Sequence, residues 1–243
     1  MVKSVLGILY ISEVNHWWFR ARRSITDFVY WKTKKKGLSI LSIGCGTGSE
    51  LESIQQYGNV TAIDIQSEAV QYCRNKGFSV IESDLLEFKP EQQYDVVVIM
   101  DVLEHIEDEE KAVNILYKLL KPGGDLLITV PACPFLWSVH DELGEYPHIR
   151  RYTYRSLKII LEKSGFIIKR LSYYNFFLFP LALCLRVLHT STASSAQEHL
   201  KVPNKLMNGL LYGIFSFEKF FLSWCNFPIG VSLLGIFHKS LRD

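Results

Sequence analysis

The chain has 243 residues, of which 48% are hydrophobic and 13% aromatic, with a net charge of +2. This length predicts one domain with an elaboration and excludes two full domains, and the apolar content is ample for a core. The five cysteines are scattered, with no C-x-x-C pair and no metal-ligand spacing. We therefore expect a reducing compartment, no disulfide framework and no metal site.

The charge is unevenly distributed along the chain. Residues 1–36 carry 8 basic and 2 acidic side chains, residues 37–150 carry 7 and 19, and residues 151–243 carry 12 and 4. Basic ends favour an anionic partner, such as a membrane surface or a phosphorylated substrate. The alternative is a set of solvated lysines. Residues 1–10 are mildly apolar but lack a small-residue cleavage site, so no signal peptide is predicted.

An amphipathic helix is expected over residues 12–36. It contains His16-Trp17-Trp18-Phe19-Arg20 and ends in a run of lysines before Gly37. One interpretation makes this helix a cap on the substrate cleft, with Trp18 contacting the substrate. In the other, its aromatic side chains pack on the core and its arginines are solvated. Both can hold together.

A glycine-rich loop follows the first predicted strand. The β-branched run 38–43 stops at Gly44-Cys45-Gly46-Thr47-Gly48, and residues 49–57 have helical character. Glycine permits positive φ angles and close approach of a ligand, and the loop directs N–H groups and a helix N-terminus at that ligand. Asp64 ends the next strand, 20 residues after Gly44, where a carboxylate can accept hydrogen bonds from both ribose hydroxyls. Nucleotide-type cofactor binding is predicted.

Together, Gly44–Gly48 and Asp64 resemble class I S-adenosylmethionine-dependent methyltransferases. Ser83-Asp84-Leu85, the strand 94–100 followed by Asp101, and Leu120-Lys121-Pro122-Gly123-Gly124 also fit, so the resemblance covers residues 37–172. It implies S-adenosylmethionine as cofactor, with a set of contacts in this chain: Gly44, Cys45, Gly46, Gly48, Asp64, Ile65, Asp84, Leu85 and Asp101. The family usually has an acidic residue at the position of Ser42, so another group is expected to assist.

Strands and helices alternate through the core. Strands are expected at 38–43, 59–64, 78–82, 94–100 and 124–130, and helices at 48–57, 67–76 and 108–120, then a helix at 154–164 and a strand at 166–173. This alternation predicts an α/β, doubly wound parallel sheet with its ligand at the carboxyl ends of the strands. The resemblance implies a Rossmann-like sheet of seven strands whose last strand, 229–238, is antiparallel. The core then spans residues 37–173 of a single domain.

Candidate catalytic residues lie in the loops after the fourth and fifth strands. Asp101 is either a cofactor contact or a helix N-cap. His105, after Glu104, is a candidate general base, and the alternative is a hydrogen bond within its loop. His140 and Asp141 form a second candidate base pair.

The loop after the fifth strand also holds a basic cluster. His148, Arg150 and Arg151 suit an anionic group of the substrate. The alternative is a surface cluster that pairs with Asp141, Glu142 and Glu145.

Residues 174–228 form an apolar insertion before the last strand. Its two apolar stretches are broken by Arg186 and by Glu218 and Lys219, so neither predicts a transmembrane helix. We expect an interfacial membrane contact, with a buried lid or a dimer surface as alternatives. The expected location is the cytoplasm, peripheral on the inner face of the cytoplasmic membrane.

The predicted function is methyl transfer to a small-molecule acceptor of lipid-linked, isoprenoid or glycan type. The alternatives are a non-catalytic cofactor-binding module, which only Ser42 favours, and a soluble small-molecule methyltransferase that dimerises through the insertion. A nucleic-acid substrate is not expected, because Asp101-Val102-Leu103-Glu104 replaces the Asn/Asp-Pro-Pro-Tyr/Phe motif of enzymes that methylate nucleic acids.

Overall fold

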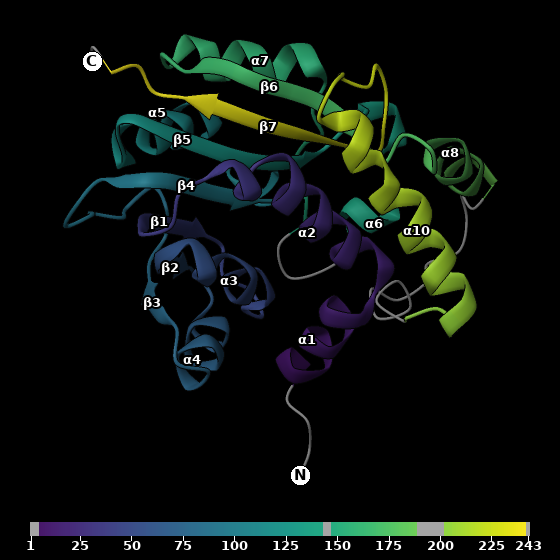
Figure 1. The fold of residues 1–243 in the computed structure, drawn as a ribbon, viewed down its shortest axis with the longest axis horizontal. Helices are drawn as coiled ribbons and strands as arrows, with labels where there is room; N and C mark the ends of the chain where they lie inside the picture. Colours follow the sequence, from purple (N-terminus) through teal and green to yellow (C-terminus); the bar gives the residue numbers. More distant parts are fainter. Residues whose placement is uncertain (1–4, 143–146, 189–201, 242–243) are drawn as a thin grey trace.

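A computed structural model describes residues 5–142, 147–188 and 202–241. Within these residues a seven-stranded sheet has the order β3-β2-β1-β4-β5-β7-β6 (Figure 1). The strands are β1 (Leu38–Ile43), β2 (Gly58–Asp64), β3 (Ser79–Glu82), β4 (Tyr94–Met100), β5 (Leu120–Pro131), β6 (Ile167–Tyr174) and β7 (Ser232–His238). β7 runs antiparallel to both β5 and β6, whereas the pairs among β1 to β5 are parallel. The predicted α/β fold with an antiparallel last strand is confirmed.

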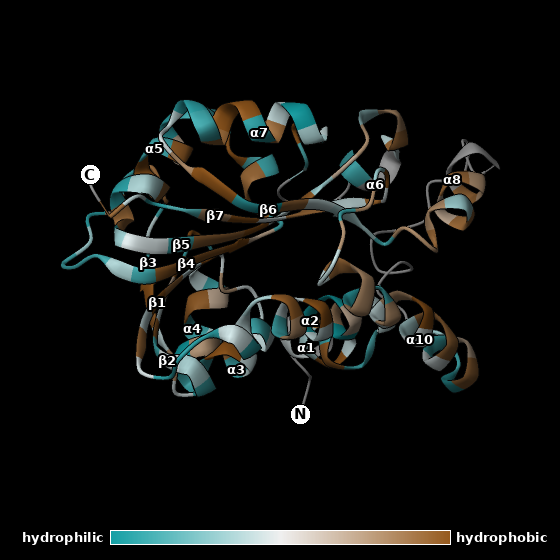
Figure 2. Cartoon of the chain, turned by 45° about the horizontal axis from the view of Figure 1, so that its top comes forward, coloured by the Kyte–Doolittle hydropathy of each residue, from teal (hydrophilic) through white to brown (hydrophobic). Residues whose placement is uncertain are grey.

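Helices cover both faces of this sheet (Figure 2). One face carries α5 (Glu109–Leu119) and α7 (Tyr154–Lys163), whose buried leucines join one apolar cluster with β4 and β5. The other face carries α2 (Trp17–Val29), α3 (Ser49–Ile54), α4 (Ser67–Asn75) and α10 (Lys205–Leu222), which share a second cluster. The strands β4, β5 and β7 are buried on both sides, which explains their nearly continuous apolar sequence.

The N-terminal region differs from the single helix expected over residues 12–36. It forms α1 (Val5–Asn15), α2 and a 3-10 turn at Trp31–Thr33. The chain bends at His16, whose extended backbone and side chain cap the first turn of α2. Asn208 of α10 stabilises the break, because its side chain accepts from Trp17 N at 2.8 Å and donates to Asn15 O at 2.9 Å. A partner 191 residues away in sequence thus fixes the bend.

β5 also begins earlier than the expected residue 124. Leu120 already pairs with Tyr94, and the register then shifts so that Asp125 pairs with Val96. The expected turn at Lys121–Gly124 is therefore a bulge between two paired segments of β5. α5 ends at Leu119 and passes directly into the strand.

The apolar insertion lies between β6 and β7 and contains α8 (Phe179–Leu188) and α10. α10 packs along α2, with Phe215 fully buried against Trp18 and Tyr174. No described helix is long and apolar enough to cross a membrane. One side of α10 is thus part of the core, and the insertion is not a detachable appendage.

Candidate active site

The glycine loop joins β1 to α3 at the carboxyl ends of the parallel strands. Gly44, Gly46 and Gly48 all have positive φ angles, of 78°, 48° and 79°. A Cβ on Gly44 would lie 2.6 Å from the Val102 side chain, so this position leaves no room for another residue. The loop is therefore closely packed at Gly44, whereas Gly46 at its centre is exposed.

Asp64 holds this loop from the tip of β2. Its Oδ2 accepts from Gly46 N at 2.9 Å, and its Oδ1 accepts from Gln66 N at 2.9 Å. Each carboxylate oxygen has a further lone pair, so the predicted ribose contacts are compatible with these bonds and stay a prediction.

The remaining predicted cofactor contacts lie on neighbouring loops. After β3, Asp84 accepts from Leu86 N at 2.8 Å, and Leu85 is buried. Cys45 is buried beneath the glycine loop, whereas Ile65 is exposed after β2.

A carboxylate from α1 reaches the same loop. Glu13 Oε2 accepts from Thr47 Oγ1 at 2.5 Å and from Ser49 Oγ at 2.6 Å. Ser42, where the family usually has an acidic residue, is buried within β1. Sequence reasoning missed Glu13 because it lies more than 30 residues before the loop, in a helix with no motif of its own.

Asp101 is an ion-pair partner and not a helix N-cap. It has a positive φ angle of 53° after β4 and pairs with the buried Arg22 of α2. Its Oδ1 accepts from Thr129 Oγ1 at 3.0 Å, and its backbone N donates to Thr129 O. The 3-10 turn that follows has Val102 at its N-cap and no side-chain capping bond. One of the two interpretations of this helix had its arginines solvated, and for Arg22 that interpretation is wrong, because Arg22 is 9% exposed.

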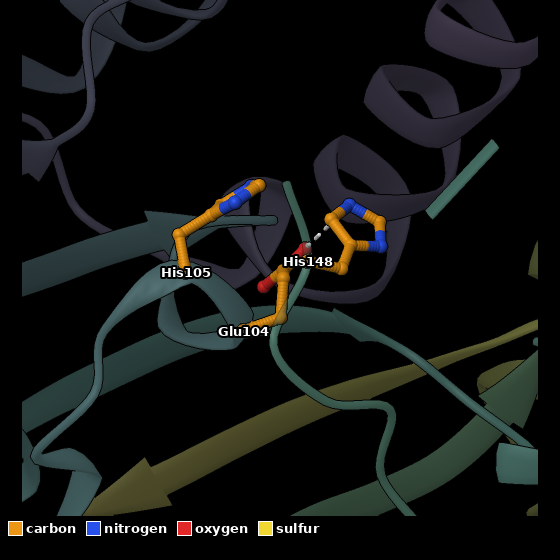
Figure 3. A group of neighbouring side chains, drawn as sticks. All are labelled: Glu104, His105 and His148. Carbon is orange, nitrogen blue, oxygen red and sulfur yellow. Dashed lines mark ion pairs between the residues drawn. The ribbon is translucent and has the colours of Figure 1, made fainter. Parts of the chain in front are cut away.

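Glu104, His105 and His148 meet beside Asp101. One oxygen of Glu104 and one ring nitrogen of each histidine lie within 4.8 Å of one another (Figure 3). Glu104 is fully buried, and neither of its carboxylate oxygens has a hydrogen-bond partner among the described residues. Burial, with a smaller effect of the nearby Asp101 carboxylate, raises the pKa of Glu104 well above its usual value.

Asp141 organises the loop after β5 from a buried position. Its Oδ1 accepts from Arg151 Nε at 2.8 Å and from His148 Nδ1 at 2.9 Å, and its Oδ2 accepts from Ser138 N at 2.9 Å. Its predicted pairing with His140 as a base stays untested, because the His140 side chain lies outside the described residues.

The two arginines of the same loop hold backbone as well as carboxylates. Arg151 donates to Ala132 O at 2.7 Å, and Arg150 donates to Ile106 O and Glu107 O and lies 3.5 Å from Glu109. The expected pairing with Asp141 is present, but it is buried and not on the surface. A role for these arginines in binding an anionic substrate stays a prediction.

Trp18 lies at the junction of α2, α10 and β6. Its ring centroid is 5.1 Å from that of Phe215 and 6.4 Å from that of Tyr174. Trp18 is half-buried, so it belongs to the packing between α2 and α10 and still has an accessible part. A substrate contact at Trp18 stays a prediction.

Comparison with known proteins agrees with this arrangement. The model of a family described as "Methyltransferase domain" matches residues 14–170. The ubiquinone biosynthesis O-methyltransferase of Erwinia tasmaniensis is 35% identical over 102 residues, which cover 38% of this chain and 42% of that protein. The chain thus aligns with less than half the length of this curated relative.

Solved structures share the fold at low sequence identity. The N-methyltransferase NodS of Bradyrhizobium japonicum WM9, in complex with S-adenosyl-L-homocysteine, has a TM-score of 0.55 at 17% identity and covers 91% of this chain and 87% of its own. A methyltransferase from Archaeoglobus fulgidus has a TM-score of 0.59 at 19% identity, with coverage of 90% and 94%. With the glycine loop, Asp64 and the strand order in place, the chain belongs to the methyltransferase-domain family.

Proposed function

We propose that this enzyme O-methylates a hydroxyl group on a lipid-linked acceptor of isoprenoid or glycan type, at the surface of a membrane. The observation that carries the proposal is an apolar stripe along α10. Leu206, Leu210, Phe217, Phe220 and Trp224 recur at helical spacing and are 85%, 56%, 53%, 49% and 90% exposed. Leu181 and Leu185 of α8 are also exposed. Large exposed apolar surfaces of this kind mark interaction sites.

The stripe is connected to the site through α2. The opposite side of α10 carries Asn208 and Phe215, which hold Trp17 and Trp18. One helical turn beyond Trp18, Arg22 pairs with Asp101 at the end of β4. An acceptor whose apolar part rests near α8 and α10 would thus have its polar head at the carboxyl ends of the strands.

The chemistry needs alignment and, for a hydroxyl, removal of a proton. The cofactor's methyl group is already activated on a sulfonium, so much of the rate can come from positioning. A base must accept the hydroxyl proton. Glu104 and His105 are our candidates, because they lie at the end of β4 beside Asp101. The name of the curated relative, an O-methyltransferase of ubiquinone biosynthesis, supports an oxygen acceptor.

The proposal is tested by incubating the enzyme with labelled S-adenosylmethionine and two phenols of equal ring structure. One carries a polyprenyl chain and is supplied in vesicles, and the other lacks the chain. We expect label in the lipid fraction, with a clear preference for the polyprenyl phenol. Equal turnover of both would contradict a lipid-linked acceptor, and cofactor binding without turnover on any membrane extract would favour a non-catalytic module.

A further inference from the structure

We propose that Glu104, His105 and His148 form a binding site for a divalent transition-metal ion of the Zn²⁺ type. Figure 3 shows the Glu104 carboxylate between the two imidazole rings. His148 Nε2 lies 3.9 Å from Glu104 Oε1, and the two ring centroids are 4.9 Å apart. In a tetrahedral Zn²⁺ site neighbouring ligand atoms are about 3.3 Å apart, so side-chain shifts of about 1.5 Å or less would close the set.

In a neutral ring, the hydrogen bond that each histidine makes through Nδ1 places the hydrogen there and the lone pair on Nε2. His105 Nδ1 lies 3.2 Å from Pro147 O, and a backbone carbonyl can only accept, so the hydrogen is on Nδ1. His148 Nδ1 lies 2.9 Å from Asp141 Oδ1, which also accepts from Arg151. Metal-binding histidines show this pattern, in which an outer oxygen fixes the tautomer and orients the ring.

Glu104 supplies the independent observation that points to a ligand. A fully buried carboxylate without a hydrogen-bond partner costs several kcal/mol unless something neutralises it. His148 Nε2 faces this carboxylate at 3.9 Å. With no proton or cation between them, the Nε2 lone pair and the carboxylate oxygen are both acceptors and cannot form a hydrogen bond with each other. A cation between them satisfies both, whereas the competing explanation is a single proton.

The ligand chemistry selects the kind of metal. Two imidazole nitrogens and one carboxylate oxygen suit Zn²⁺ and its first-row neighbours, whereas Mg²⁺ prefers oxygen ligands. Spacing along the chain does not indicate such a site, because Glu104 and His105 are adjacent while His148 lies more than 40 residues later, on another loop. Only the return of residues 147–150 to β4, where Ile149 N donates to Glu104 O at 2.9 Å, brings the three together.

Three protein ligands leave a coordination position open. An acceptor hydroxyl bound there would lose its proton to solvent water more readily, because a metal lowers the pKa of a bound oxygen acid. With the ion bound, Glu104 and His105 would act as ligands and no longer as the base. This catalytic role depends on the proposed function, but metal binding does not.

The test titrates the full-length protein, stripped with a chelator, with Co²⁺ and Zn²⁺. Cys184 and Cys225 are exposed thiols, so a C184S/C225S background removes adventitious binding. We expect one ion per chain and a Co²⁺ absorption spectrum of nitrogen and oxygen ligation. Glu104→Gln and His148→Ala should each weaken binding on the order of 100-fold.

The matched control is His238→Ala. His238 forms a histidine–carboxylate pair with Asp125 at 2.8 Å, at the start of β5 and far from the site. This variant should bind Co²⁺ like the wild type. Retained S-adenosyl-L-homocysteine binding shows that each variant folds. If the buried substitution Glu104→Gln prevents folding, His148→Ala still tests the site, because the His148 ring is partly exposed.

Three results would overturn the proposal. The first is that a protein that binds S-adenosyl-L-homocysteine binds neither Co²⁺ nor Zn²⁺. The second is that both variants keep the metal affinity of the wild type. The third is that the protein binds Mg²⁺ but neither of the other two ions. Metal binding without activity on any phenol would refute only the proposed function.

Discussion

At the scale of single residues, the site combines local motifs with partners from distant segments. The glycine loop, Asp64, Asp84 and Asp101 are recognisable in sequence because their spacing follows from strand, turn and helix. Glu13 and Arg22 are not, because α2 and α1 reach the loop only through the packed fold. A motif thus predicts where the cofactor binds but not which distant groups contact that loop.

Asp64→Ala should weaken binding of S-adenosyl-L-homocysteine by about 2 kcal/mol if both ribose hydrogen bonds are charge-assisted. The same change also frees Gly46 N from its bond to the carboxylate. Isothermal calorimetry measures the loss, and Asp64→Asn, which keeps one acceptor oxygen, should lose less. Undiminished affinity in the alanine variant would contradict the ribose assignment.

Glu13→Gln should also weaken cofactor binding, by about 1–2 kcal/mol. The substitution removes a negative charge that two loop hydroxyls hold beside the cofactor site, and the cofactor carries positive charge on its ammonium and sulfonium groups. Its matched control is Glu52→Gln on α3, because the Glu52 side chain bonds Tyr10 of α1 and Lys76 of the loop after α4, and only its backbone N contacts the glycine loop, at Gly48 O. A larger loss of cofactor affinity in the Glu52 variant than in the Glu13 variant would mean that the packing of α1 on α3, and not the charge of Glu13, determines cofactor affinity.

At the scale of elements, the packing of α10 explains why a charged residue interrupts its apolar sequence. Glu218 was an interruption in the sequence, but in the structure it is fully buried and accepts from Phe177 N at 2.9 Å. Burial raises the pKa of Glu218 to about 7. The prediction of a single helix over residues 12–36 was wrong because of a distant contact too: the break at His16 depends on hydrogen bonds to Asn208.

Glu218 makes stability depend on pH. Its pKa is higher in the folded than in the unfolded chain, so the folded state binds more protons between about pH 4.5 and 7. The free energy of unfolding should therefore fall as the pH rises through this window, by about 3 kcal/mol in total. Urea unfolding at pH 5 and pH 8.5 measures the slope.

Glu218→Gln is the matched variant for this effect. It keeps an oxygen that can accept from Phe177 N but cannot ionise. It should remove most of this pH dependence and be more stable than the wild type at pH 8.5. An equal slope in wild type and variant would show that other groups cause the dependence.

At the scale of the whole molecule, the α/β sheet with its parallel strands follows from the alternation of strands and helices, and most strand bounds agree within two residues. The joining of α1, α2 and α10 into one layer was not predictable, because it depends on contacts across nearly the whole chain. For the basic cluster at residues 148–151, pairing with Asp141 was expected as one alternative, but the burial of this pairing was not predictable. Long-range packing is the physical information that spacing does not contain.

Membrane attachment is a prediction for the whole molecule. Vesicles with anionic lipid should float the wild type, with weaker flotation in high salt and a salt-resistant remainder from the apolar stripe. Because α10 also fills the core, the sharper test is a surface variant, Leu206→Ser/Leu210→Ser/Trp224→Ser, which should stay at the bottom of the gradient yet bind cofactor. Ile159→Ser, at an exposed residue of α7, is the control.

Failure of the wild type to float would contradict the membrane contact. A dimer in solution that the surface variant converts to monomers would instead identify the stripe as a contact between two copies of the chain. Either result removes the main support for a lipid-linked acceptor.

The position of β7 has a consequence for the order in which the protein folds. β7 follows β6 in the sequence but lies between β5 and β6 in the sheet, so β6 cannot join the sheet before β7 has been synthesised. The polar backbone groups at the α1–α2 bend likewise lack their partner until Asn208 has been synthesised. Long-range closures of this kind slow folding and leave apolar surface exposed during synthesis. The nascent chain therefore exposes Trp17, Trp18 and the unpaired edges of β5 and β6 until residues 205–238 have emerged.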